Sequence, residues 1–279
     1  MATLIQTLQN VLAPKDPTLP VETKRILLKE ALQSYVLDFV YNHSAYRRLN
    51  FYGGTCLHVV FGLNRLSEDL DFDNSSKIDL AALPDDLQTL FHQTFGYREA
   101  TVKSQRGEQG ILRVTLKFPV LQDLGVSPYS NEALHLKVEV SAHKQISVLQ
   151  NTPVFYFGRS FVPSHFSLET MMAGKMIACL ERNFQRGREG AFIKGRDFYD
   201  LLWYMQKGIR PLEEKLAKDG RKSYTVESAM LALQKKVKAL QVAELAVDLF
   251  PMFESRAFIE NWLDAFHENF PRYAGNYLG

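Results

Sequence analysis

Apolar residues recur at helical spacing in the first long segment of the chain. They lie three or four residues apart, at Ile26, Leu27, Ala31, Leu32, Tyr35, Val36, Phe39 and Val40. This pattern predicts a long amphipathic helix that ends near His43. The string Phe51-Tyr52-Gly53-Gly54-Thr55 follows, and its glycine pair predicts the end of a strand, a turn and then a short helix.

A second pattern, with a period of two residues, predicts a strand. Leu70 and Phe72 alternate with Asp69, Asp71 and Asp73. Successive side chains of a strand point to opposite faces, so the two apolar residues face a core and the aspartates share the other face. The side chains of Asp69 and Asp71 are therefore expected to point the same way.

The remaining patterns divide the chain into a mixed first half and a helical second half. In the first half we expect a helix over 84–95 and strands over 99–103, 111–118 and 136–141. In the second half we expect Ser167 to cap a helix that continues to about Asn183, and further helices over 196–206, 225–248 and 256–268. We therefore predict the α+β fold class, with a mixed α/β domain over 1–165 and a helical domain over 166–279.

Charge and cysteine content narrow the class of protein. The chain has 33 basic and 31 acidic residues, a formal charge of +2, so an anionic partner must be met by a local cluster of cations.

Cys56 and Cys179 lie in apolar stretches without C-x-x-C spacing, and no charged-then-apolar leader is seen, which indicates a reduced cytoplasm. No uncharged run approaches the roughly 20 residues of a membrane span, so no membrane partner is expected. The scattered histidines do not show zinc-ligand spacing.

The glycine pair and the aspartate strand together indicate phosphate and metal chemistry. Gly53 and Gly54 let backbone amides approach a phosphate at a helix N-terminus, and Thr55 adds a hydroxyl donor. Asp69 and Asp71, two residues apart on a strand, present the paired oxygens that Mg²⁺ accepts together with water and substrate phosphates. These residues predict a site for a metal-bound nucleoside triphosphate.

A third carboxylate is expected on a neighbouring strand. Glu139 has the required apolar-charged-apolar setting in Leu136-Lys137-Val138-Glu139-Val140-Ser141, and Lys137 shares its face. We therefore predict Asp69, Asp71 and Glu139 as catalytic metal ligands, with Mg²⁺ as the cofactor and Mn²⁺ as its alternative. Metals bridged in this way activate an attacking hydroxyl and neutralise a leaving pyrophosphate. Lys137 is predicted to contact the nucleotide.

The combined motif resembles the polymerase-β-like nucleotidyltransferase superfamily, whose signature is a glycine turn, a short helix, an Asp-x-Asp strand and a later strand carboxylate. This resemblance covers residues 51–141. The string GGTCLHVVFGLNRLSEDLDFD is similar, more specifically, to the AbiEii/AbiGii-type toxin family. That family also carries a helical lysine and a late Arg-Asp-x-Tyr-Asp segment, which correspond here to Gly174-Lys175-Met176 and to the segment from Lys194 to Leu201.

The resemblance implies a function and roles for further residues. It implies the toxin of a toxin–antitoxin pair that transfers a nucleotide from an NTP to a hydroxyl, with a tRNA 3′ end as the first choice of acceptor. It implies that Ser67 donates to a phosphate, Arg65 braces the site, Lys175 contacts the triphosphate and Asp197 supports Lys175 or the attacking group. It also implies a small mixed sheet and a helical domain that completes the active-site cleft.

Basic residues of the second half indicate a polyphosphate or RNA contact. Lys175, Arg182 and Arg186 are spaced seven and four residues apart, which predicts one basic face of a helix, and Arg182 is predicted to contact the nucleotide. Arg188, Lys194 and Arg196 extend this character through a glycine-containing segment that could meet an RNA backbone.

Simpler interpretations remain open at this point. The aspartates could be solvated, Lys175 could be a surface lysine, Asp197 could be a helix N-cap, and Arg65 and Ser67 could only order a turn. Rival functions are a phosphotransferase that moves the γ-phosphoryl group, transfer to a protein or small-molecule hydroxyl, and a non-catalytic RNA- or protein-binding module.

Overall fold

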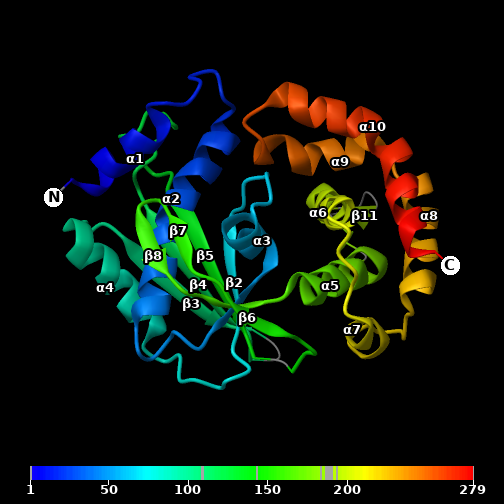
Figure 1. Cartoon of the computed structure of the whole chain (residues 1–279). Helices are drawn as coiled ribbons and strands as arrows, with labels where there is room; N and C mark the ends of the chain where they lie inside the picture. The colour runs from blue at the N-terminus through cyan, green and yellow to red at the C-terminus, as the bar shows by residue number, and fades with distance from the viewer. Residues whose placement is uncertain are drawn as a thin grey trace. The chain divides into compact units, whose positions relative to one another are not determined.

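The computed structural model describes residues 2–107, 110–142, 144–182, 184–185, 191–192 and 194–278. The chain forms two compact units (Figure 1). Unit 1 comprises Met1–Lys144 and Leu149–His165, and unit 2 comprises Gln145–Val148 and Phe166–Gly279. No helix of the described residues is both long enough and apolar enough to cross a membrane.

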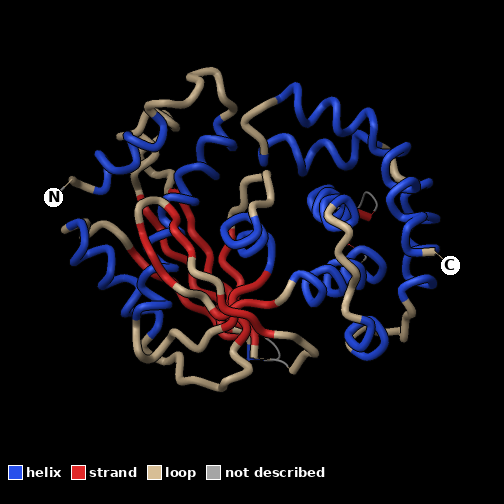
Figure 2. The backbone as a smooth tube through the Cα atoms, in the orientation of Figure 1, coloured by secondary structure: helices blue, strands red, loops and turns tan. Residues whose placement is uncertain are grey.

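Unit 1 is built on a mixed sheet. Its helices are α1 (Leu4–Leu12), α2 (Val21–Asn42), α3 (Gly53–Phe61) and α4 (Leu83–Phe95). Its strands are β1 (Asn50–Tyr52), β2 (Asp69–Asp73), β3 (Thr101–Arg106), β4 (Leu112–Phe118), β5 (Leu134–Ser141), β6 (Leu149–Asn151), β7 (Val154–Tyr156) and β8 (Arg159–Phe161), followed by β9 (Ser164–Phe166) at the boundary of the units. The main sheet, whose strands are red in Figure 2, has the order β3-β4-β5-β2-β1-β9-β6, and β7 pairs with β8.

The sheet mixes parallel and antiparallel pairs, and the predicted α+β class is confirmed. β2 pairs parallel with β5, whereas β1 with β2, β5 with β4 and β4 with β3 pair antiparallel. The parallel β2–β5 pair matters for the site, because it brings strands more than sixty residues apart in sequence into register. The strand predicted at 99–103 runs from Thr101 to Arg106 instead.

One face of the sheet forms the core of unit 1. Leu70 and Phe72 are fully buried there, as the alternating pattern predicts. α2 contacts β5, and α4 contacts β3 and β4 (Figure 1). The ring of Tyr41 on α2 lies 6.3 Å from that of Phe72, and the ring of Phe91 on α4 lies 4.7 Å from that of Phe118. The opposite face of β2, β4 and β5 is consequently left to polar side chains.

Unit 2 is mainly helical, as predicted. It contains α5 (Leu168–Glu181), β10 (Phe184–Gln185), β11 (Ala191–Phe192), α6 (Gly195–Gln206), α7 (Glu213–Lys218), α8 (Val226–Ala239), α9 (Val242–Leu249) and α10 (Arg256–Ala274), with short 3₁₀ turns at Phe250–Met252 and Gly275–Tyr277. Ser167 caps α5, and its hydroxyl accepts from the Thr170 amide at 3.3 Å.

The predicted single helix over 225–248 is wrong. The segment forms α8 and α9, separated by Leu240 and Gln241. Leu240 has extended backbone and a buried side chain, and the Gln241 side chain caps the first turn of α9. Apolar spacing alone does not reveal such a break, because both helices bury residues of similar period. The last helix is longer than predicted and continues through Pro271 to Ala274.

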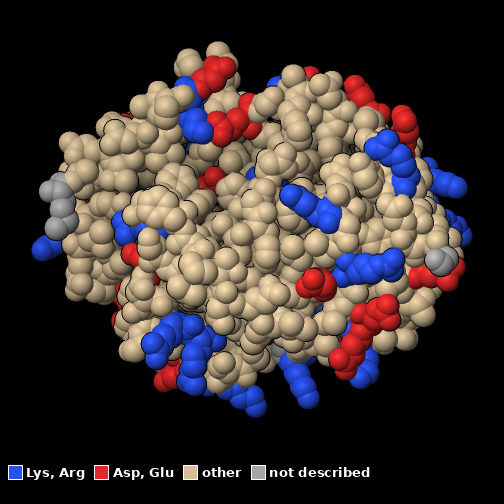
Figure 3. Space-filling model, viewed as in Figure 1, with Lys and Arg blue, Asp and Glu red and all other residues tan. Residues whose placement is uncertain are grey.

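The short elements were not predicted. α1, α7 and the strands β6 to β9 have few residues each and carry no long periodic signal. Basic and acidic side chains are interspersed over the surface shown in Figure 3, which agrees with the nearly balanced charge of the chain.

Candidate functional site

The predicted carboxylates of unit 1 lie on neighbouring strands. Asp71 and Glu139 are register partners across the parallel strands β2 and β5, and Asp69 pairs in the same way with Lys137. Asp69, Asp71 and Glu139 are partly exposed, while their strand neighbours Leu70 and Phe72 are buried. The strand register therefore places the three acids and Lys137 on the polar face of the sheet.

The carboxylate of Glu139 is engaged by an arginine. Arg113 on β4 is the register partner of Glu139, and its Nε lies 3.1 Å from Glu139 Oε1. Both side chains are well exposed, at 50% and 39%. Among the described residues, no group of three or more His, Cys, Asp or Glu side chains is arranged to hold a metal ion. The predicted third ligand thus shares the face of the aspartates but pairs with Arg113.

The aspartate pair nevertheless fits a magnesium ion. Mg²⁺ in nucleotide enzymes is commonly held by one or two carboxylates, with water and substrate phosphates as the other ligands. Asp69 and Asp71 supply two carboxylates from one strand face and remain partly exposed. They would hold the ion, whereas Oε1 of Glu139 is already in contact with Arg113.

Gly53 allows the first turn of α3 to lie against Asp71. It starts α3 with a φ of +82°, and a Cβ added there would stand 2.4 Å from Asp71 Oδ2. Any other residue would both strain the backbone and collide with the carboxylate. The amides of Gly53, Gly54 and Thr55 form the first turn, where helix N–H groups lack partners within the helix and favour an anion. An acidic strand and an anion-favouring helix end are therefore adjacent within one unit.

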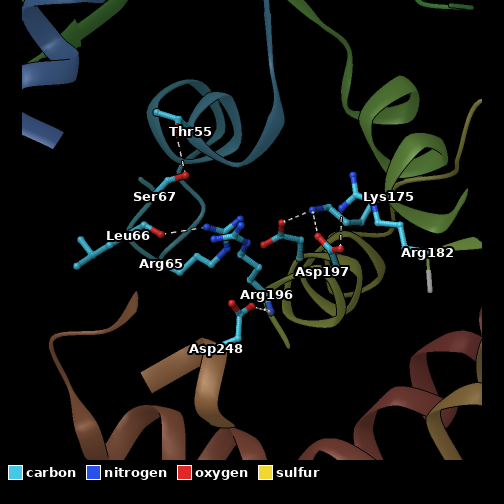
Figure 4. Close-up of polar contacts among 10 residues, drawn as sticks. Thr55, Arg65, Leu66, Ser67, Lys175, Arg182, Arg196, Asp197 and Asp248 are labelled. Atoms are coloured by element: carbon cyan, nitrogen blue, oxygen red, sulfur yellow. Dashed lines mark hydrogen bonds and ion pairs between the residues drawn. The ribbon is translucent and has the colours of Figure 1, made fainter. Parts of the chain in front are cut away.

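Gly54 makes room for Arg65 and Ser67. A Cβ at Gly54 would lie 2.5 Å from Arg65 Nη2 and 3.1 Å from Ser67 Oγ. Arg65 is 2% exposed, and its Nη1 donates to the Leu66 carbonyl at 3.0 Å (Figure 4). Both positions therefore need glycine. Gly53 leaves room for Asp71, and Gly54 leaves room for Arg65 and Ser67.

Thr55 and Ser67 tie α3 to β2. The Thr55 hydroxyl donates to the backbone carbonyl of Asp69, and its Oγ1 lies 2.8 Å from Ser67 Oγ (Figure 4). Thr55 is fully buried and Ser67 nearly so. Buried hydroxyls need such partners, so the structure gives both side chains a bracing contact, and the phosphate contact expected from the sequence stays a prediction. The backbone amide of Thr55 keeps its place in the first turn of α3.

Two buried polar residues of α2 were missed. The Ser67 amide donates to Glu30 Oε1 at 3.1 Å, and Gln33 Nε2 donates to the Ser67 carbonyl at 3.0 Å. Glu30 and Gln33 are both buried. Their signal in the sequence is the presence of two polar residues, one helical turn apart, within the apolar face of a helix.

Tyr52 was also missed. It is the register partner of Asp71 on β1, so it lies on the same sheet face. Burial, followed by the charge of Asp71, raises the pKa of Tyr52 to about 12, and its hydroxyl lies 3.4 Å from Ser141 Oγ. The hydroxyl therefore stays protonated at neutral pH and can serve as a hydrogen-bond donor beside the carboxylates.

Unit 2 contains the other predicted group. Lys175 on α5 lies between two carboxylates of α6, with Nζ 2.8 Å from Asp197 Oδ1 and 2.9 Å from Asp200 Oδ2. Arg182 Nη1 lies 3.2 Å from Asp197 Oδ2 (Figure 4). Asp200 was not predicted, although its spacing of three residues from Asp197 places both acids on one helix face.

Charge keeps Asp197 ionised inside unit 2. Burial alone would raise its pKa, but Lys175 and Arg182 outweigh that effect and lower the pKa of Asp197 to about 2. Asp197 lies in the first turn of α6, whose N-cap is Lys194, so the N-cap alternative for Asp197 is wrong. Arg196 places its backbone amide 2.9 Å from Asp248 Oδ2 (Figure 4).

The predicted basic helix face is present as far as Arg182. α5 ends at Glu181, and its C-cap Arg182 still donates its backbone amide to the Ala178 carbonyl at 3.1 Å, so Arg182 keeps the helical spacing from Lys175 and both cations contact Asp197. Arg186 and Arg188 lie outside the described residues. The predicted residues thus form two groups, one in unit 1 around Asp69 and Asp71 and one in unit 2 around Lys175.

Comparisons with known proteins identify the family. Curated proteins yield no significant match to the chain. A solved structure of an H. pylori protein described as a candidate nucleotidyltransferase is 18% identical, and the alignment covers 88% of this chain and 91% of the other with a TM-score of 0.49. A likeness of this degree carries no inference about activity. Residues 42–273, most of the chain, match one family, and the chain therefore belongs to the nucleotidyl transferase AbiEii toxins of type IV toxin–antitoxin systems.

Proposed function

We propose that this protein transfers a nucleoside monophosphate from an NTP to an acceptor hydroxyl, releases pyrophosphate, and depends on Mg²⁺ or Mn²⁺. The observation that carries the proposal is the position of Asp71 under Gly53. It places a partly exposed carboxylate pair beside the amino end of α3 within one unit. Carboxylates attract a divalent cation and a helix amino end attracts a phosphate, so the two together suit a metal-bound triphosphate.

The residues of unit 1 divide the chemistry between them. A bound Mg²⁺ supplies charge neutralisation for the triphosphate and acidifies a coordinated hydroxyl. Asp69 and Asp71 would hold the ion, and the first-turn amides of α3 would bind phosphate oxygens. The acceptor oxygen forms a bond to the α-phosphorus, the bond from that phosphorus to the pyrophosphate oxygen breaks, and the hydroxyl gives its proton to a neighbouring base.

Three further residues have proposed roles. Glu139, on the same sheet face, would help to position the acceptor hydroxyl after exchanging its contact with Arg113. Lys137, the register partner of Asp69, is a proposed nucleotide contact. Lys175 is a proposed catalytic residue, and Asp197 and Asp200 would fix its ammonium group.

The biological setting follows from the family. AbiEii proteins are toxins of type IV toxin–antitoxin systems. The proposed acceptor is RNA, with a tRNA 3′ end as the first choice, and the proposed partner is a cognate antitoxin in the same cytoplasm. Nucleotidyl transfer to the end that must be aminoacylated would explain toxicity.

Labelled nucleotides test the proposal directly. The full chain is incubated with Mg²⁺, total cellular RNA and each NTP, labelled in one series at the α-phosphate and in another at the γ-phosphate. Stable label on RNA from the α series alone is expected. Label from the γ series alone would identify a phosphotransferase instead, and label on protein would identify a different acceptor.

Asp71→Asn supplies the matching control. The exchange removes one negative charge at a partly exposed position, so the far-ultraviolet circular dichroism spectrum and the melting temperature should remain close to those of the wild type. Transfer should fall by a factor of about a thousand or more, since metal binding and charge neutralisation are lost together. A folded variant with full activity would refute the assignment of Asp71.

A further inference from the structure

The polar face of the sheet continues beyond Asp69 and Asp71 as a groove over β5, β4 and β3. The groove has a volume of about 230 Å³, and its polar lining consists of Lys103, Gln105, Arg113, Thr115, Lys137 and Glu139. We call it the sheet-face groove. Val114 and Val138 also border it, but their side chains are buried in the core, so they contribute backbone to its floor.

Strand register fixes the order of these side chains across the sheet. One row, from β2 outward, consists of Asp69, Lys137, Thr115 and Lys103. The adjacent row consists of Asp71, Glu139, Arg113 and Gln105. Neighbouring strands lie about 4.8 Å apart, so the outer end of each row lies roughly 14 Å from the aspartates. Figure 1 labels these four strands side by side.

The groove is predominantly basic. Its lining holds three cations, Lys103, Arg113 and Lys137, against one acid, Glu139. The next row adds Lys117 of β4 opposite His135 of β5. Burial, together with the charges of Lys117, Lys29 and Lys137, lowers the pKa of His135, which agrees with a local excess of positive charge on this face.

The spread of the cations distinguishes between anionic ligands. A single phosphate would be met by donors converging on one point, whereas these cations lie on three successive strands. A triphosphate held by the aspartates and the amino end of α3 would leave Arg113 and Lys103 two and three strands away. A series of cations spaced along a groove matches an anion whose negative charges repeat at intervals.

We propose that the sheet-face groove binds the phosphodiester backbone of a single-stranded nucleic acid and leads its 3′-terminal hydroxyl to Asp69 and Asp71. The direction of the strand rests on the proposed nucleotidyl transfer, whereas the backbone contact rests on the groove alone. Lys103, Arg113 and Lys137 are the phosphate contacts, and Gln105 and Thr115 donate hydrogen bonds to phosphate or sugar oxygens. The residues that line the groove include no aromatic ring on which a base could stack.

A peptide is a poorer match to this lining. Extended peptides are usually recognised through an edge strand and pockets for apolar side chains, and the apolar residues bordering the groove are buried. Binding through phosphates predicts an affinity that is steeply dependent on salt and nearly independent of base sequence.

Binding of a twelve-nucleotide, 5′-fluorescein-labelled RNA strand to the full chain tests the assignment without NTP. The variant Lys103→Gln/Arg113→Gln is expected to bind at least tenfold more weakly than the wild type. Its slope of log affinity against log salt should be smaller by about 1.4, because each phosphate of a single strand that a cation neutralises accounts for about 0.7. Oligo-U and oligo-A should bind with similar affinity.

Two further variants sharpen the result. Arg48→Gln removes an exposed arginine at the opposite end of β1 from Gly53 and should bind RNA like the wild type. Lys103→Gln alone avoids any disturbance of Glu139 and should weaken RNA binding about threefold to tenfold. Melting temperatures confirm that each variant is folded.

The possible outcomes separate the two proposals. Unchanged RNA binding in both groove variants, or an equal loss in Arg48→Gln, would overturn the groove assignment. Loss of NTP binding without loss of RNA binding would also overturn it and identify a triphosphate site. If the wild-type protein binds RNA through the groove but never transfers an α-labelled nucleotide, the proposed function is refuted. The groove assignment would then still hold.

Discussion

Asp71 on β2 and Glu139 on β5 are register partners in two parallel strands, and both point to the polar face of the sheet. Their carboxylates nonetheless have different surroundings. Asp71 lies against the first turn of α3, whereas Glu139 pairs with Arg113 on the other side. The strand register therefore places Glu139 beside Asp71, while the carboxylate of Glu139 pairs with Arg113.

Removing Arg113 should make Glu139 available to a metal. In Arg113→Gln we expect Mn²⁺, measured by electron paramagnetic resonance, to bind a few-fold more tightly, because a neighbouring positive charge is removed and the carboxylate is released. Exposed ion pairs contribute about 1 kcal/mol or less, so stability should change little. Glu139→Gln should weaken Mn²⁺ binding, and unchanged affinity in that variant would exclude Glu139 as a ligand.

Gly53→Ala should inactivate the protein. The new Cβ would stand 2.4 Å from Asp71 Oδ2 and would also occupy a left-handed backbone conformation. Gly62→Ala at the other end of α3 is the matched control, since its φ is +72° but no atom lies within 4 Å of its Cβ. Gly62→Ala should lose about 1 kcal/mol of stability from backbone strain, and Gly53→Ala should lose more because its Cβ also collides with Asp71. Only Gly53→Ala should lose nucleotidyl transfer, and equal activity in the two would contradict the role of the close approach.

Thr55→Val should destabilise unit 1 in the absence of nucleotide. The variant removes the buried hydroxyl that reaches the Asp69 carbonyl and Ser67, which typically costs about 1 to 3 kcal/mol when a buried partner is left unsatisfied. Urea denaturation measures this loss of stability. Thr55→Ser keeps the hydroxyl and should retain most of the wild-type stability. A Thr55→Val protein as stable as the wild type would favour a direct role in substrate binding over a bracing role.

Lys175→Met should destabilise unit 2 strongly. It leaves Asp197 and Asp200 buried with one cation fewer, and removal of one partner from a buried ionic group typically costs about 3 to 5 kcal/mol. Adding Asp200→Asn to Lys175→Met should recover part of that stability, because one uncompensated buried charge is removed. Strictly additive losses in chemical denaturation would contradict direct coupling between these residues.

Asp197 should make the stability of the protein sensitive to acid. Its pKa is about 2 in the folded state, below the ordinary value of 3.8. A lowered carboxyl pKa stabilises the folded state above the ordinary value, and the contribution of about 2 kcal/mol disappears as pH falls through 4 towards 2. The difference in unfolding free energy between wild type and Asp197→Asn should therefore shrink between pH 5 and pH 2. A constant difference over that range would show that Asp197 does not titrate in this way.

Local patterns along the chain were enough to predict the elements with a strong periodic signal. The alternation of Leu70 and Phe72 with aspartates predicts β2 and its polar face, and the spacing of apolar residues predicts α2. The glycine pair before a short helix also predicts the start of α3, because a positive φ and a close approach demand glycine in any fold. These features depend on residues a few positions apart, so local physics suffices to find them.

The partners of the polar groups, by contrast, were set by the packing of the folded chain. The pairing of Glu139 with Arg113, the bracing hydroxyl of Thr55 and the contacts of Glu30 with Ser67 join residues that are distant in sequence or that could equally have faced solvent. The break between α8 and α9 likewise depends on where Leu240 is buried. Hydrogen bonds and ion pairs form with whichever groups packing brings within reach, and periodicity along the chain contains no information about that choice.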